Sequence, residues 1–194
     1  MQLLSLTLLC VLGMFSLANA EEIRSKDVLS ELDKQLLIAC SRGDLERAKQ
    51  LLNDGANPRH KEHIHPAIEP NTPLLCAIVN NHKEVAILLI EKGATAGKGQ
   101  ELNELGIASA SGKHEYVQLI LDHMKQRQKG VFRSNLINCL VAAIRSGRDD
   151  GVIFLINRYP SDITEEVQQK VLQQFSGEPV IQTKAKKLLS SVRR

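Results

Sequence analysis

The sequence predicts an all-α solenoid, a row of short helix–turn–helix units stacked side by side, with helical caps at its ends. Two observations predict this fold class. Residues 72–94 read as one complete helix–turn–helix unit, and weaker copies of the unit recur on both sides. The turns inside these copies are 38, 31 and 35 residues apart and fall at Gly43, Asn81, Gly112 and Gly147. Two short helices cannot bury their own apolar faces, so each unit needs a similar neighbour.

The central unit carries start and stop signals for both of its helices. Thr72 followed by Pro73 is typical of a helix start, because the threonine oxygen can accept from free backbone N–H groups and proline fits the first helical position. Asn81 suits the left-handed turn that ends the first helix, and Gly93 ends the second. Apolar residues at helical spacing fill both helices: Leu74, Leu75, Ala77 and Ile78, then Val85, Ile87, Leu88, Leu89 and Ile90.

The flanking copies keep the same order of apolar helix, turn and second apolar helix. Their first helices and turns are found at residues 36–44, 105–113 and 140–148. Second apolar stripes follow near residues 48–52, 116–121 and 152–156. We therefore expect about four units over residues 36–160.

This pattern resembles the ankyrin repeat, which has a period of about 33 residues and the signature Thr-Pro-Leu-His-x-Ala. Residues 72–77 read Thr-Pro-Leu-Leu-Cys-Ala, so Leu75 occupies the histidine position. The glycine–alanine pairs at 55–56 and 93–94 match the end of the family's second helix. The resemblance covers roughly residues 36–159 and implies a scaffold for binding proteins. A generic array of helical hairpins is the alternative.

The amino-terminal residues 1–20 have the pattern of a secretory signal peptide. They are largely apolar and uncharged, and small residues lead to Ala20, which directly precedes Glu21. The pattern predicts cleavage between Ala20 and Glu21 and export to the periplasm or the outside of the cell, although Lys and Arg are missing near Met1. A retained membrane anchor is the alternative, but the apolar run is short for a bilayer span. We expect no transmembrane helix in the mature chain.

Two further segments flank the predicted units. Residues 21–35 are predicted to form an amino-terminal capping segment, and residues 161–194 a carboxy-terminal helical cap, because an open stack needs polar ends. A polar, basic link is expected over residues 124–134, between the third and fourth units.

The net charge and the residue composition disfavour some classes of function. The net charge of +3 is too small to indicate a nucleic-acid partner, and aromatic residues make up only 3% of the chain, which disfavours a base-stacking surface. No catalytic constellation, phosphate-binding loop or cofactor motif stands out. We expect a non-catalytic monomer that binds a protein, with no cofactor.

The connection between the first two units indicates where a partner binds. It is about five residues longer than the ankyrin pattern would have, and it holds three prolines, which rule out a regular helix. In ankyrin repeats, which this chain resembles, the same connection forms a projecting finger, and the fingers line the binding surface. The predicted partner-binding residues are Arg59, His60, Lys61, Glu62, His63, His65 and Glu69.

The same finger raises the question of a metal. His60, His63 and His65 could approach one another in a loop, and imidazoles bind zinc or copper. No pair of ligands lies on one helix face and no cysteine joins them. We therefore favour an exposed polar loop and predict no metal site.

Cys40, Cys76 and Cys139 remain after cleavage of the predicted signal peptide. Their apolar surroundings favour buried thiols that act as small hydrophobic residues. A disulfide between Cys40 and Cys76 is the alternative if the compartment is oxidising.

The sequence thus favours an exported ankyrin-type module that binds a protein partner through its fingers and first helices. Three other functions stay open. They are an effector of the ankyrin type that acts inside a host cell, a membrane-anchored scaffold, and an enzyme, for which no sequence feature argues.

Overall fold

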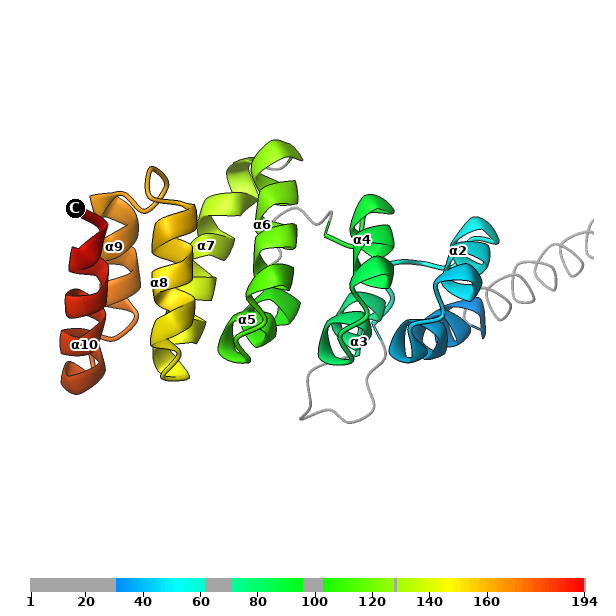
Figure 1. The fold of residues 1–194 in the computed structure, drawn as a ribbon, viewed down its shortest axis with the longest axis horizontal. Helices are drawn as coiled ribbons and strands as arrows, with labels where there is room; N and C mark the ends of the chain where they lie inside the picture. The colour runs from blue at the N-terminus through cyan, green and yellow to red at the C-terminus, as the bar shows by residue number, and fades with distance from the viewer. Residues whose placement is uncertain (1–30, 62–70, 96–102, 128, 194) are drawn as a thin grey trace, which may run out of the picture.

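The protein forms a single row of antiparallel helix pairs in the computed structural model, which describes residues 31–61, 71–95, 103–127 and 129–193 (Figure 1). The predicted signal peptide, its cleavage site and residues 21–30 lie outside the described residues. The described part confirms the predicted all-α solenoid of stacked helix–turn–helix units.

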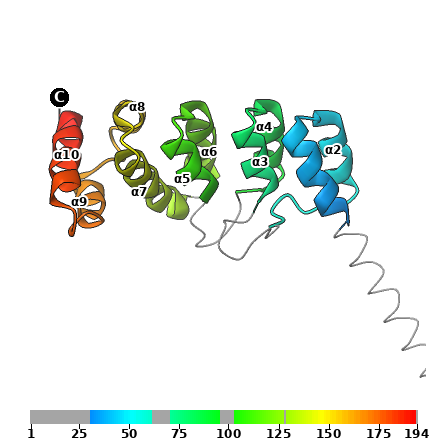
Figure 2. The same ribbon diagram turned by 90° about the horizontal axis from the view of Figure 1, so that it is seen from below.

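Each unit consists of a first helix, a tight turn and a second helix. The first unit pairs residues 31–42 with α2 (Leu45–Asn53), and the second pairs α3 (Pro73–Val79) with α4 (Lys83–Glu91). The third pairs α5 (Asn103–Ala110) with α6 (His114–Arg127), and the fourth pairs α7 (Lys129–Arg145) with α8 (Asp149–Arg158). The row ends with α9 (Glu165–Gln173), α10 (Pro179–Leu189) and a 3₁₀ turn, η1 (Ser190–Arg193). Seen from below, the first helices form one layer and the second helices the other (Figure 2).

The four predicted turns are confirmed by their backbone geometry. Gly43, Asn81, Gly112 and Gly147 have φ values of 74°, 63°, 71° and 70°, the left-handed conformation that ends a helix. The residue after each turn donates its backbone N–H to the carbonyl of an alanine five positions earlier. These bonds are 2.8–3.0 Å long in all four units and end on Ala39, Ala77, Ala108 and Ala143. One turn geometry therefore recurs through the stack.

The predicted helix start at Thr72 is also confirmed. Its Oγ1 accepts a hydrogen bond from the Leu75 N–H at 3.1 Å, which caps α3. The same hydroxyl donates to Glu104 Oε1 of the next unit at 2.6 Å, and both side chains are buried. Thr72 thus caps its own helix and joins the second unit to the third.

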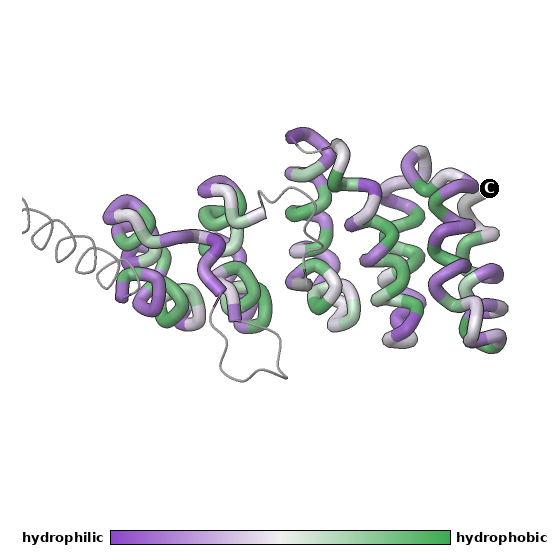
Figure 3. Tube along the Cα trace, turned by 180° about the vertical axis from the view of Figure 1, so that it is seen from behind, coloured by the Kyte–Doolittle hydropathy of each residue, from purple (hydrophilic) through white to green (hydrophobic). Residues whose placement is uncertain are grey.

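The core is continuous along the row. Buried Leu, Ile, Val and Ala from all five helix pairs belong to one cluster, which reaches from Leu36 to Leu189. Hydrophobic residues recur in every pair rather than gathering in one (Figure 3). The described helices include none that is both long enough and apolar enough to span a bilayer.

The link predicted over residues 124–134 does join the third and fourth units, but most of it is helical. Helix α6 continues to Arg127 and α7 begins at Lys129. Met124 and Phe132 are buried, so apolar residues hold both helix ends against the core, while the described charges of Lys125, Arg127 and Arg133 are exposed. The polar residues of this stretch therefore form the exposed face of two helix ends.

Candidate protein-binding surface

The described part of the finger is a compact turn, residues 57–61, which we call the finger base. Asn57 Oδ1 accepts from the Arg59 N–H at 2.9 Å, and Asn57 O accepts from the His60 N–H at 3.0 Å. Both bonds are typical of turns that begin with asparagine. The finger base is therefore ordered by its own sequence.

An acidic side chain on the first helix anchors this turn. Asp33 Oδ1 accepts from the Asn57 N–H at 2.6 Å, and Asp33 Oδ2 lies 3.2 Å from His60 Nδ1. The Asp33 side chain is 14% exposed and that of His60 is 21% exposed. Asp33 thus fixes the finger base on the first unit.

The predicted partner-binding residues divide into three groups. Arg59 and Lys61 are exposed at the finger base, while His60 packs inward against Asp33. Glu62, His63, His65 and Glu69 lie outside the described residues. Asp33 was not predictable from the sequence, because no local pattern links an acidic residue on a helix to a finger that begins 24 residues later.

A second set of exposed residues lies at the ends of the first helices, next to the turns. We call this set the first-helix rim. It consists of Arg42, Val79, Asn80, Ser111, Arg145 and Ser146. Val79 is 52% exposed, an unusual position for a large apolar side chain. The rim offers one apolar contact among polar and cationic groups.

Side chains from the following unit hold the rim at a fixed spacing. His82 Nε2 lies 3.1 Å from Ser41 O, and Lys113 Nζ donates to Val79 O at 3.3 Å and to Asn81 Oδ1. We call His82, Lys113 and Arg148 the latch residues. Each directly follows the turn of its own unit and contacts the carboxy-terminal end of the first helix in the preceding unit.

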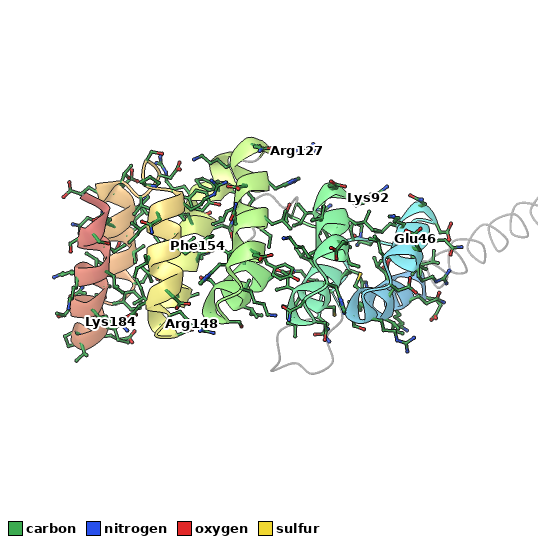
Figure 4. All side chains as sticks on the ribbon, viewed as in Figure 1. Glu46, Lys92, Arg127, Arg148, Phe154 and Lys184 are labelled. Carbon is green, nitrogen blue, oxygen red and sulfur yellow. The ribbon has the colours of Figure 1, made fainter. Side chains whose placement is uncertain are left out.

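Arg148 makes the same contact in the fourth unit. Its Nη2 donates to Ser111 O at 2.9 Å and its Nε to Ala110 O at 3.4 Å. Figure 4 shows Arg148 at the start of α8, next to the third unit. Carbonyls at a helix end have no partner within the helix, so the latch residues satisfy them and join neighbouring units.

Gly43 has no Cβ atom and so leaves space for the side chain of the latch residue His82. A Cβ atom at Gly43 would lie 2.4 Å from His82 Nδ1, and the φ of 74° disfavours any side chain there.

The opposite face of the stack, formed by the second helices, is built from polar contacts. Between α6 and α8, Asp122 receives the Tyr159 hydroxyl at 2.9 Å and the Arg158 guanidinium at 2.6 Å. Between α4 and α6, Lys83 Nζ lies 2.8 Å from Glu115 Oε2 across a shallow groove. The hydrogen bond from Lys83 and its charge lower the pKa of Glu115.

The described cysteines act as buried or half-buried thiols. Burial, with a smaller contribution from Cys76, raises the pKa of Cys40 to about 12, and burial also raises the pKa of Cys139. Among the described residues Cys40, Cys76 and Cys139 form no disulfide. Within the described ranges, no group of three or more His, Cys, Asp or Glu residues is arranged to hold a metal ion.

Comparisons with known proteins agree with this geometry. No curated protein matches the chain. The family described as ankyrin repeats in three copies matches residues 17–100 and 36–126, which together cover more than half of the chain. Helices α7 to α10 lie beyond the matched residues and continue the same pairing. The chain belongs to the ankyrin-repeat family.

Proposed function

We propose that this ankyrin-repeat chain is exported and binds a protein partner, without catalysis, through the finger base and the first-helix rim. Ankyrin repeats indicate a module for protein–protein interaction. The observation that carries the proposed surface is Val79, which stays 52% exposed among the polar and cationic residues of the rim.

The order of this surface supports a binding function. The latch residues fix the rim of each unit to the next unit, and Asp33 fixes the finger base. A surface that is ordered before it meets a partner loses little conformational entropy on binding. The exposed Arg42, Arg59 and Lys61 add positive charge near this surface, which favours a partner with acidic side chains.

Site-specific photo-crosslinking in the native host tests the proposed surface. A photoreactive amino acid replaces Val79 in one full-length variant and Lys92, which follows α4 on the second-helix face, in a matched control. We expect a discrete protein adduct from position 79 and none from position 92. The double substitution Val79→Asp with Arg42→Glu should then prevent capture of that partner, while Lys92→Glu should not. Equal adducts from both positions would contradict the proposed surface.

Export rests on the amino-terminal sequence. The apolar, uncharged residues before Ala20 are typical of a signal peptide. The intact mass of the protein in each cell fraction tests the proposal directly, and we expect a species that begins at Glu21 outside the cytoplasm. A species that keeps Met1 in the membrane would indicate an anchored scaffold. The same species in the cytosol, or protein delivered into another cell, would favour an intracellular partner or an effector function.

A further inference from the structure

The second helices repeat one pair of polar positions across neighbouring units. Lys83 lies two residues after the turn of its unit, and its Nζ is 2.8 Å from Oε2 of Glu115, which lies three residues after the next turn. The same two positions in the third and fourth units are His114 and Asp150. His114 Nε2 lies 3.6 Å from Asp150 Oδ2. The same contact therefore uses a lysine between the second and third units and a histidine between the third and fourth.

Helix α8 fixes the orientation of the His114 ring. The ring stacks on Phe154, which Figure 4 labels on α8, with ring centroids 5.0 Å apart and planes inclined by 10°. A Cβ atom at Gly151 would lie 3.4 Å from His114 Nε2, so this edge of the ring faces the first turn of α8. His114 Nε2 is buried and has no hydrogen-bond partner within the described part of the chain. The ring is thus held with this nitrogen near the Asp150 carboxylate.

Charged and titratable groups surround His114 on its own helix and on the neighbouring helices. Those that adjoin it in sequence, line the same hollow or begin α8 are Lys83, Lys113, Glu115, Tyr116, Arg148, Asp149 and Asp150. Most of these side chains already have partners. Lys83 pairs with Glu115, Arg148 donates to backbone carbonyls of the third unit, and Asp149 lies 2.7 Å from Lys184 of α10. Among the described residues, Asp150 forms no ion pair except the contact with His114.

We propose that His114 and Asp150 form a proton-dependent ion pair, which tightens the interface between the third and fourth units on acidification. Imidazoles take up a proton between about pH 8 and about pH 5, while carboxylates stay ionised in this range. The protonated His114 ring donates from Nε2 to Asp150, and its positive charge is attracted to the face of the Phe154 ring. The stabilisation is therefore present at acid pH and is lost as the pH rises through the range in which histidine titrates.

The equivalent positions at the other two interfaces do not respond to the same change of pH. Lysine and glutamate both keep their charges in this range, so the pair between the second and third units is constant. Between the first and second units the two positions hold Leu45 and Glu84, which cannot form an ion pair. The first-helix rim crosses the responsive interface between Ser111 and Arg145. Acidification therefore fixes the spacing of these two rim positions more firmly.

Hydrogen exchange of the full chain and of His114→Gln, each at acid and at neutral to basic pH, tests the proposal. At about pH 5, exchange in α8 should be about 2- to 10-fold faster in the variant, because it lacks the ion pair and the cation–π contact. At about pH 8 this ratio should be smaller by about 2-fold or more, since the imidazole is then neutral. Comparing the two proteins at one pH cancels the effect of pH on exchange itself and on other histidines, such as His60 beside Asp33. A ratio that is the same at both pH values would overturn the proposal.

Matched variants identify the two partners. His114→Lys supplies a constant cation, as Lys83 does, and should slow exchange in α8 relative to His114→Gln by the same factor at both pH values. In an Asp150→Asn background, most of the pH dependence of the His114→Gln ratio should disappear. If the full pH dependence persisted there, the carboxylate of Asp150 would not be the partner and the proposal would be wrong. Lys83→Gln should accelerate exchange in α4 and α6 equally at both pH values, and unchanged exchange in the first unit would show that each variant stays folded.

Discussion

At the scale of single residues, Gly43 combines a positive φ with a close approach of His82. Gly43→Ala should destabilise the protein by about 1–3 kcal/mol, because alanine is strained at this φ and displaces the His82 latch. Urea unfolding measures the change. Gly130→Ala is the matched control, since Gly130 lies in α7 and an added Cβ there meets no atom within 4 Å. The control should stabilise the protein by about 0.5–1 kcal/mol, and the same sign for both variants would contradict the argument.

The buried bond between Thr72 and Glu104 leads to a second prediction at this scale. Thr72→Val removes the cap of α3 and leaves the Glu104 carboxylate without its hydroxyl donor. We expect a loss of about 2–4 kcal/mol, the sum of a lost cap and an unsatisfied buried group. Thr72→Ser keeps the hydroxyl and should cost less than about 1 kcal/mol. Chemical denaturation measures the stability of both variants, and an equal loss would contradict the prediction because it would show that the methyl group contributes as much as the hydroxyl.

At the scale of elements, the bridge between α4 and α6 predicts a pH dependence. Lys83 lowers the pKa of Glu115, so Glu115 releases its proton more readily in the folded protein than in the unfolded chain. Its contribution to stability is therefore present above the unfolded pKa and is lost as the pH falls through the folded pKa. An NMR titration of the Glu115 carboxyl carbon should show the lowered pKa, and Lys83→Met should return it toward the ordinary value.

Glu166 of α9 provides the control for that titration. Its pKa is lowered by Lys170, with a smaller contribution from Arg133, and Lys83 is not among the causes. Lys83→Met should therefore leave the Glu166 titration unchanged. If both carboxyl groups shifted together, a change in the whole fold would be the cause rather than loss of one bridge.

The helices also show which parts of the fold the sequence could predict. The turns at Gly43, Asn81, Gly112 and Gly147 and the start at Thr72 were predictable, because each depends on local backbone preferences of a few residue types. The helical ends of α6 and α7 within the predicted link were missed, since burial of Phe132 outweighs the polar composition around it. Contacts between distant residues, such as Asp33 with His60 and Thr72 with Glu104, depend on stacking and have no local signal. The whole predicted finger site remains a prediction, and four of its seven residues, Glu62, His63, His65 and Glu69, lie outside the described ranges.

At the scale of the whole molecule, the row of units predicts that the stability of each unit depends mainly on its own packing and on its contacts with the neighbouring units. Each helix pair packs mainly on the pairs before and after it, so the energy of the stack is close to a sum of unit and interface contributions. Ile120 is fully buried in α6, at the middle of the row, and Val167 is fully buried in α9, near its end. Charges at these two positions should therefore have different consequences.

We expect Ile120→Asp to disrupt the third unit and divide the stack. Hydrogen exchange measured by mass spectrometry should accelerate first in α5 and α6 and next in the helices that pack against them, α3, α4 and α7. Val167→Asp should accelerate exchange in α9 and α10 while the first and second units keep their protection. If either substitution raised exchange equally in every described helix, the chain would unfold as one cooperative unit. The binding surface at the finger base would then depend on the integrity of the far end of the row, which nearest-neighbour stacking does not allow.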